Sequence, residues 1–156
     1  MAIVGGGHLG RIHAKLAQAH EQFEVIAVAD PCPESRALVT QQLALPTVAD
    51  YHELIGRIDA AIVAPPTIAH YEVTSTLLAR ACIRSLKSHW PVQPIKLSRL
   101  VQIAASHGRV LQTGHVERFN PTWTAAAPHL GRPKFIEAVR AGATVVVAPI
   151  SVWSWT

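Results

Sequence analysis

Three glycines near the N-terminus have the spacing of a loop that binds phosphate groups. Gly5, Gly7 and Gly10 form the pattern G-x-G-x-x-G, directly after an apolar run and before a helical stretch. The first glycine permits a tight turn, the second lets the backbone approach a pyrophosphate, and the third lets the helix pack on the strand. Phosphates bind the N–H groups at a helix N-terminus, so we expect His8 and Leu9 to belong to the same site.

An acidic residue follows the next apolar run. Asp30 comes twenty residues after Gly10, where its carboxylate is placed to accept hydrogen bonds from ribose hydroxyls. A carboxylate there would repel a 2′-phosphate, which favours NAD over NADP as the cofactor, although the nearby Arg36 leaves NADP open. The pattern therefore predicts a dinucleotide site. The alternative is a glycine-rich turn beside a solvent-facing Asp30.

A second turn with a possible role in binding is Ala64-Pro65-Pro66-Thr67, which ends another apolar run. Ligands of open α/β sheets bind beyond the carboxyl ends of the strands, so we expect Ala64, Pro65 and Thr67 to flank the nicotinamide-side ribose. The alternative is a turn that only ends the strand. His8 and His13 have no third ligand nearby, so no metal site is predicted.

Alternating strands and helices must position these turns. We predict strands at Ala2–Val4, Phe23–Ala29, Ile58–Ala64 and Arg109–Thr113. We predict helices at Leu9–His20, Pro33–Leu45, Asp50–Ile55, Ile68–Ala81 and Leu100–Ser106. The first helix is expected to place Leu9, Ile12, Leu16 and Ala17 on its buried face. This alternation predicts an α/β fold, a Rossmann-type doubly wound parallel sheet.

Residues 81–98 interrupt the alternation. They contain no clean strand, and they place Lys, His and Trp where a buried run is due, followed by two prolines. Beyond them we expect a polar loop at Gly114–Pro121 and a further strand at Phe135–Arg140.

Composition excludes several classes of protein. The chain has 156 residues, of which 49% are hydrophobic and 15% charged, which indicates a globular protein rather than a disordered one. Its net charge of +4 comes from scattered residues, so we expect no nucleic-acid partner. No apolar run reaches membrane-spanning length. Cys32 and Cys82 lack metal-ligand spacing and are predicted to be core cysteines of a cytoplasmic protein. A homo-oligomer is left open.

Four motifs together resemble the Gfo/Idh/MocA oxidoreductases, the family of glucose–fructose oxidoreductase and inositol dehydrogenase. These motifs are V-G-G-G-H-L-G (Val4–Gly10), V-A-D-P (Val28–Pro31), A-P-P-T-I-A-H (Ala64–His70) and G-H-V-E-R-F-N-P (Gly114–Pro121). The resemblance implies NAD(P)-dependent dehydrogenation of a hydroxyl on a sugar, nucleotide sugar or cyclitol. It also implies a dinucleotide-binding domain at 1–121, with 122–156 as only the start of the family's C-terminal α/β domain.

The last of these motifs contains the candidates for substrate contact. His115 is a weak candidate for a catalytic residue, because it follows a strand and could line the substrate site or be structural. Arg118 and Asn120 could bind polar groups of a sugar-like substrate or hold the loop in place.

The resemblance also exposes a missing motif. Family members carry Glu-Lys-Pro after the fifth strand, and its lysine binds substrate and assists proton transfer. Ser85–Pro91 can be encoded so that a shifted frame reads Val-Glu-Lys-Pro-Leu-Ala, and Pro149–Thr156 can be encoded so that the same phase reads Asp-Ile-Gly-Val-Val-Leu-Asp.

These readings lead to a hypothesis about the gene. The reading frame would be shifted between about Arg80 and Ser98 and again near Gly142, so that Lys87 is not the family lysine. The alternative function is then a catalytically inactive, truncated remnant that at most binds nucleotide.

Overall fold

A computed structural model describes residues 1–80, 85–87, 94–115 and 119–129, with the backbone alone for 85–87 and Pro94. The chain divides into two compact units, Met1–Phe119 and Asn120–Thr156. The first contains the sheet and the predicted dinucleotide loop, and the second is described separately below.

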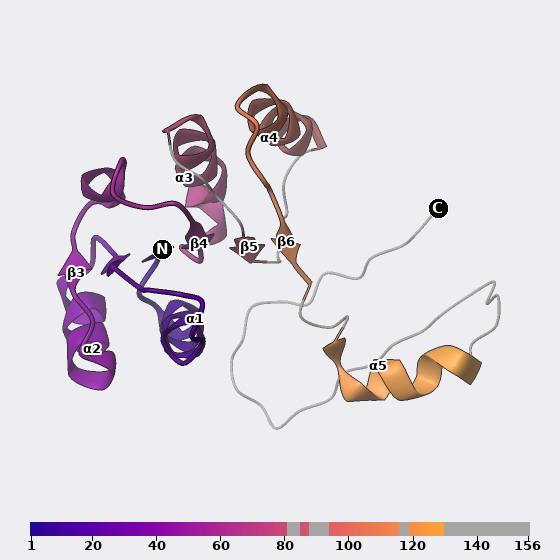
Figure 1. Ribbon diagram of the computed structural model, residues 1–156, viewed down its shortest axis with the longest axis horizontal. Helices are drawn as coiled ribbons and strands as arrows, with labels where there is room; N and C mark the ends of the chain where they lie inside the picture. Colours follow the sequence, from indigo (N-terminus) through magenta and orange to yellow (C-terminus); the bar gives the residue numbers. More distant parts are fainter. Residues whose placement is uncertain (81–84, 88–93, 116–118, 130–156) are drawn as a thin grey trace. The chain divides into compact units, whose positions relative to one another are not determined.

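A six-stranded parallel sheet forms the centre of the first unit, in the order β3-β2-β1-β4-β5-β6 (Figure 1). Its strands are β1 (Ala2–Val4), β2 (Ala27–Ala29), β3 (Thr47–Val48), β4 (Ala61–Val63), β5 (Ser85–Lys87) and β6 (Thr113–Gly114). This is the strand order of the dinucleotide-binding doubly wound fold, with the reversal of direction between β1 and β4. The predicted Rossmann-type sheet is therefore confirmed.

The helices of this unit form a layer on each face of the sheet. They are α1 (His8–Gln18), α2 (Pro33–Leu43), the 3₁₀ helix η1 (Tyr51–Leu54), α3 (Thr67–Arg80) and α4 (Pro94–Ser106). Figure 1 shows α1 and α2 on one side of the strands and α3 and α4 on the other. Right-handed crossovers require this division, because the chain reverses its direction across the sheet after β3.

Each layer has its own hydrophobic core. Ile3 and Val28 of the sheet pack with Ala14 of α1 and Val39 of α2. On the other face, the buried cluster includes Val4, Leu54, Val63, Leu77 and Leu100. Successive residues of a strand point to opposite faces, and both faces of β1 and β2 are buried, which is why these strands read as continuous apolar runs.

Several predicted boundaries are wrong. The irregular segment 81–98 does contain a strand, β5, which pairs with β4 and β6, and α4 begins at Pro94 rather than at Leu100. The strand predicted at Arg109–Thr113 is confined to Thr113–Gly114. Gly114 therefore belongs to a strand rather than to the predicted loop. Parallel pairing with neighbours, rather than local apolar content, defines these short strands.

Strand β3 was not predicted, and β2 is shorter than expected. Thr47 and Val48 pair with Val28 and Ala29, although two residues carry too little periodicity to be recognised in a sequence. Phe23, predicted to begin the second strand, is exposed.

The predicted buried face of α1 is also wrong. Leu9, Ile12 and Leu16 are exposed, and the buried residues of the helix are Gly10, Ala14 and Ala17. Only Ala17 of the predicted face is buried. Small side chains face the sheet because α1 approaches the backbone of β1 closely, as the Gly10 contact described below demonstrates.

The prediction that Cys32 is a core residue is wrong. Cys32 is an exposed free thiol at the N-cap of α2, and its Sγ donates a hydrogen bond to Glu34 Oε2 at 2.9 Å. This bond, the backbone N–H of Glu34 and nearby Arg36 lower the pKa of the Glu34 carboxyl.

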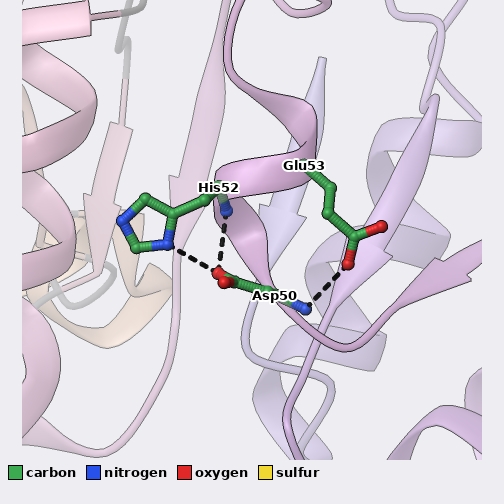
Figure 2. Close-up of polar contacts among 3 residues, drawn as sticks. All are labelled: Asp50, His52 and Glu53. Atoms are coloured by element: carbon green, nitrogen blue, oxygen red, sulfur yellow. Dashed lines mark hydrogen bonds and ion pairs between the residues drawn. The ribbon is translucent and has the colours of Figure 1, made fainter.

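The 3₁₀ helix η1 lies between β3 and β4 in the chain, and its Leu54 joins the buried cluster that contains Leu77 and Leu100. A capping box holds its start (Figure 2). Asp50 Oδ1 accepts from the backbone N–H of His52 at 2.9 Å and lies 2.6 Å from His52 Nδ1. Glu53 Oε1 in turn accepts from the backbone N–H of Asp50 at 3.4 Å. Hydrogen bonds from the backbone and side chain of His52 lower the pKa of the Asp50 carboxyl.

The described part of the second unit is a short helical segment, α5 (Pro121–Ala126) followed by η3 (Ala127–His129). Asn120 is the N-cap of α5, and its side chain accepts from the backbone N–H of Thr122 at 3.0 Å. Pro121 occupies the first helical turn, where its missing N–H costs nothing.

Several predictions lie outside the described residues. They concern Cys82, Arg118, the strand at Phe135–Arg140 and the tail at Pro149–Thr156. Within the ranges that are described, no helix has the length and apolar content needed to cross a bilayer.

Candidate cofactor-binding site

The glycine loop joins β1 to α1 at the carboxyl end of the sheet. Gly5 has a φ of +100°, a backbone conformation that glycine adopts without strain, and its N–H donates to the carbonyl of Ala29 at 2.7 Å. A Cβ atom on Gly10 would overlap the carbonyl oxygen of Gly5. The first and third glycines are therefore required by the backbone itself.

Gly7 has a different environment. A Cβ added to it would meet no heavy atom within 4 Å, and its φ of −63° is open to any residue. Nothing inside the protein therefore requires glycine at this position. An open space above the loop is what the predicted close approach of a pyrophosphate needs.

The N-terminus of α1 has the polarity that an anion requires. Gly7 is its N-cap and has no side chain to cap the first turn, and that turn contains no acidic residue. His8 and Leu9, the first residues of the helix, are both exposed. The first N–H groups of a helix and its dipole together favour a negatively charged ligand.

Asp30 lies beside this loop and holds it. Its Oδ2 accepts from the backbone N–H of Gly6 at 2.6 Å, and its Oδ1 accepts from that of Cys32 at 2.8 Å. The carboxylate thus ties the glycine loop to the end of β2. Each carboxylate oxygen has a second lone pair, so these two bonds leave acceptor capacity for a ribose hydroxyl.

Two arginines make backbone contacts around the same loop. Arg11 Nη1 donates to the carbonyl of Gly6 at 3.0 Å. Arg36 Nη1 donates to the carbonyls of Asp30 and Pro31, at 2.8 and 2.9 Å respectively. The sequence prediction missed Gly6 and Arg11, and the only available signal was their position within and directly after the glycine motif.

The structure brings the Ala64–Thr67 turn into contact with the glycine loop. A Cβ on Gly5 would lie 2.5 Å from the carbonyl carbon and oxygen of Ala64 and 2.6 Å from the nitrogen of Pro65. Ala64, Pro65 and Thr67 are half-buried, and the backbone N–H of Ala64 donates to Val4 at 2.7 Å. Two turns predicted separately therefore form one continuous surface at the reversal point of the sheet.

The structure does not bring His115 into this cluster. His115 is exposed and follows β6, three strands from β1, or about 14 Å at the usual strand spacing. The described contacts of Asn120 include the cap of α5. The roles assigned to His115, Arg118 and Asn120 stay predictions. Among the described residues, no group of three or more His, Cys, Asp or Glu side chains could hold a metal ion.

Comparison with known proteins agrees with this geometry. Residues 1–115 match the model of the Gfo/Idh/MocA family, described as an oxidoreductase family with an NAD-binding Rossmann fold. The chain is 26% identical over 139 residues to UDP-N-acetylglucosamine 3-dehydrogenase of Acidithiobacillus ferrooxidans, covering 88% of this chain and 44% of that protein.

A second relative matches over a shorter range. The chain is 41% identical over 80 residues to a putative UDP-kanosamine synthase oxidoreductase subunit of Amycolatopsis mediterranei, covering 50% of this chain and 22% of the relative. The chain therefore spans less than half the length of both curated relatives.

The fold comparison gives the same result. The crystal structure of GenD2 from gentamicin A biosynthesis, in complex with NAD, superimposes with a TM-score of 0.76 at 19% identity, covering 83% of this chain and 38% of that one. This superposition agrees with the fold, and the match to the family model confirms the predicted resemblance and the predicted class of cofactor. The chain belongs to the Gfo/Idh/MocA oxidoreductases, a family whose Rossmann fold binds NAD.

Proposed function

We propose that the glycine loop of this chain binds the pyrophosphate of NAD, and that the protein is a dehydrogenase of a sugar, nucleotide-sugar or cyclitol hydroxyl. The observation that carries the binding proposal is the contrast between the glycines. Gly5 and Gly10 are required by backbone contacts, whereas Gly7 faces open space that a ligand can fill. The names of two relatives, a UDP-N-acetylglucosamine 3-dehydrogenase and a putative UDP-kanosamine synthase subunit, support a nucleotide sugar as the class of substrate.

The residues divide into three groups in this proposal. The backbone at Gly7, His8 and Leu9 binds the pyrophosphate at the N-terminus of α1. The Asp30 carboxylate accepts hydrogen bonds from the adenosine ribose hydroxyls and, at the same time, from the backbone N–H of Gly6. Ala64, Pro65 and Thr67 flank the nicotinamide-side ribose, because their turn packs directly on Gly5.

Bound NAD would supply the hydride acceptor, and the protein would position the substrate hydroxyl and receive its proton. The described residues near the loop offer no convincing general base. His115, Arg118 and Asn120 are proposed to contact the substrate. A preference for NAD follows from the Asp30 carboxylate, which would repel a 2′-phosphate, while Arg36 donates to backbone carbonyls. Cytoplasmic location and homo-oligomer formation stay predictions.

Titration of the purified chain with NADH, followed by nicotinamide fluorescence, tests the binding proposal. Gly7→Ala should abolish or strongly weaken binding while lowering the free energy of unfolding by no more than about 1 kcal/mol, since the added Cβ enters empty space and only the N-cap preference for glycine over alanine is lost. The matched control is Ala105→Ser, which adds one heavy atom at an exposed position of α4. Equal NADH affinity in Gly7→Ala and the parent chain would contradict the proposed site.

Activity is tested separately with NAD and a panel of UDP-sugars and inositols. Production of NADH from one of them supports the dehydrogenase. Binding of NADH without turnover of any substrate supports the alternative, a protein that only binds nucleotide. Resequencing the locus tests the frame hypothesis, which fails if the codons of Ser85–Pro91 cannot spell Glu-Lys-Pro in the alternate phase.

A further inference from the structure

His70 is a buried polar residue that the proposed site does not yet use. It lies in the first turns of α3, is 5% exposed, and its Nε2 is 2.7 Å from the carbonyl oxygen of Pro65. A carbonyl oxygen can only accept a hydrogen bond, so Nε2 carries the hydrogen and donates. The imidazole therefore bonds back to the turn from which its own helix starts.

This turn is short of backbone donors. Pro65 and Pro66 are consecutive and neither has an N–H, so the turn cannot be held by its own amides at these positions. The remaining backbone bonds lie at its edges, from Ala64 N–H to Val4 at 2.7 Å and from Ala69 N–H to Pro66 at 3.0 Å. The His70 side chain supplies the bond to the Pro65 carbonyl at the centre of the turn.

The turn lies in direct backbone contact with the glycine loop. The Ala64–Pro65 peptide packs on Gly5, and the carbonyl of Gly5 packs in turn on Gly10 at the start of α1. Backbone atoms cannot rotate away from such contacts as a long side chain can. A displacement of the Pro65 carbonyl would therefore change the side of this contact that the Ala64–Thr67 turn forms, while the Asp30 bond keeps Gly6 in place.

We propose that His70 is a positioning residue of the dinucleotide site, which fixes the Ala64–Thr67 turn against the glycine loop for the nicotinamide-side half of the cofactor. This inference rests on the proposed function. It predicts an effect on one half of the ligand only, because Asp30 and the N-terminus of α1 hold the adenosine and phosphate half. If His70 only stabilised the hydrophobic core, its replacement would weaken the binding of both halves of the dinucleotide equally, or of neither half.

Three substitutions separate these roles. His70→Ala removes the donor. His70→Gln keeps an amide nitrogen at about the reach of Nε2, whereas His70→Asn places its nitrogen nearer the position of Nδ1. The control is His20→Ala, an exposed histidine beyond the C-terminal end of α1, away from the glycine loop. Each full-length variant is titrated with NADH and, separately, with ADP, which lacks the second ribose and the nicotinamide.

We expect His70→Ala and His70→Asn to weaken NADH binding about three- to tenfold, the equivalent of one neutral hydrogen bond, and to leave ADP binding within about twofold of the parent chain. His70→Gln should recover most of the NADH affinity, and His20→Ala should match the parent chain.

Other outcomes overturn the inference in distinguishable ways. Equal loss for NADH and ADP, or no loss for NADH in His70→Asn, would show that His70 does not position the turn. If His70→Ala and His70→Asn both unfold while His70→Gln stays folded, the hydrogen bond serves the stability of the fold rather than the cofactor site. Failure of the parent chain to bind NADH would overturn the proposed function together with this inference.

Discussion

The two helices that begin at the reversal point of the sheet, α1 and α3, are packed in opposite ways. Helix α1 buries small residues, Gly10, Ala14 and Ala17, and exposes large ones. Helix α3 buries large residues, including Val73, Leu77 and Leu78.

The difference follows from what each helix does. The start of α1 must lie against the backbone of Gly5, so small residues face the sheet and the glycine loop stays tight. The start of α3 bonds back to its own turn through His70, and its large side chains pack into the buried cluster on that face of the sheet. Stability should therefore depend on keeping small side chains where α1 contacts the glycine loop, and on keeping large apolar side chains where α3 packs in the core.

The strongest test of close packing at α1 is Gly10→Ala. Helix propensity alone predicts that alanine stabilises this position by about 1 kcal/mol. Overlap between the new Cβ and the Gly5 carbonyl predicts the opposite sign, a loss on the order of 4 kcal/mol or more. Urea unfolding followed by circular dichroism measures the change, with Gly7→Ala as the control. A stabilised Gly10→Ala variant would show that α1 is free to move away.

Burial at α3 is tested by Leu77→Ala. Leu77 is fully buried among Val63, Leu78 and Leu100, so truncation leaves a cavity in a packed cluster. We expect a loss of about 3 kcal/mol, within the range for large-to-small core substitutions. The free energy of unfolding in urea provides the measurement. A loss below about 1 kcal/mol would mean that this face of the sheet is loosely packed.

A change of pH should affect neither α1 nor α3 but the capping box of η1, which lies between β3 and β4 in the chain. The folded pKa of Asp50 lies below its ordinary value of 3.8, so its contribution is present above that value and is lost as the pH falls through the folded pKa. Asp50→Asn should therefore lose less stability than the parent chain between pH 5 and pH 2. Thermal unfolding across this range measures the slopes, and parallel slopes would contradict the assignment.

The smallest effect is expected at the exposed face of α1. Leu16 is 63% exposed, so Leu16→Ala removes few buried contacts and should change stability by no more than about 0.5 kcal/mol. It is the matched partner of Leu77→Ala, since the same atoms are deleted from the neighbouring layer. If Leu16→Ala and Leu77→Ala lose similar amounts of unfolding free energy, the proposed difference in packing between α1 and α3 is wrong.

The sequence was most informative where chemistry and backbone geometry agree. Glycines at fixed spacing followed by Asp30 predicted the loop, the helix start and the family, because few other residues tolerate the contacts at Gly5 and Gly10. Apolar runs located β1, β2 and β4, and the alternation of elements predicted a parallel sheet.

Sequence periodicity could not identify which apolar residues are buried. Leu9, Ile12 and Leu16 have the spacing of a core face, yet they are exposed because close approach to β1 admits only small side chains. Strands β3 and β5 were missed because two or three residues become a strand only when neighbouring strands pair with them.

By itself, then, the sequence determined the dinucleotide motif, the α/β order of the elements and the family to which the chain belongs. Only the tertiary structure decided that Asp30 holds Gly6 and that the two turns meet at Gly5. The physical reason is distance along the chain. Local spacing defines a turn or a helix, whereas contacts between residues 24 or more positions apart exist only after the parallel strands have paired.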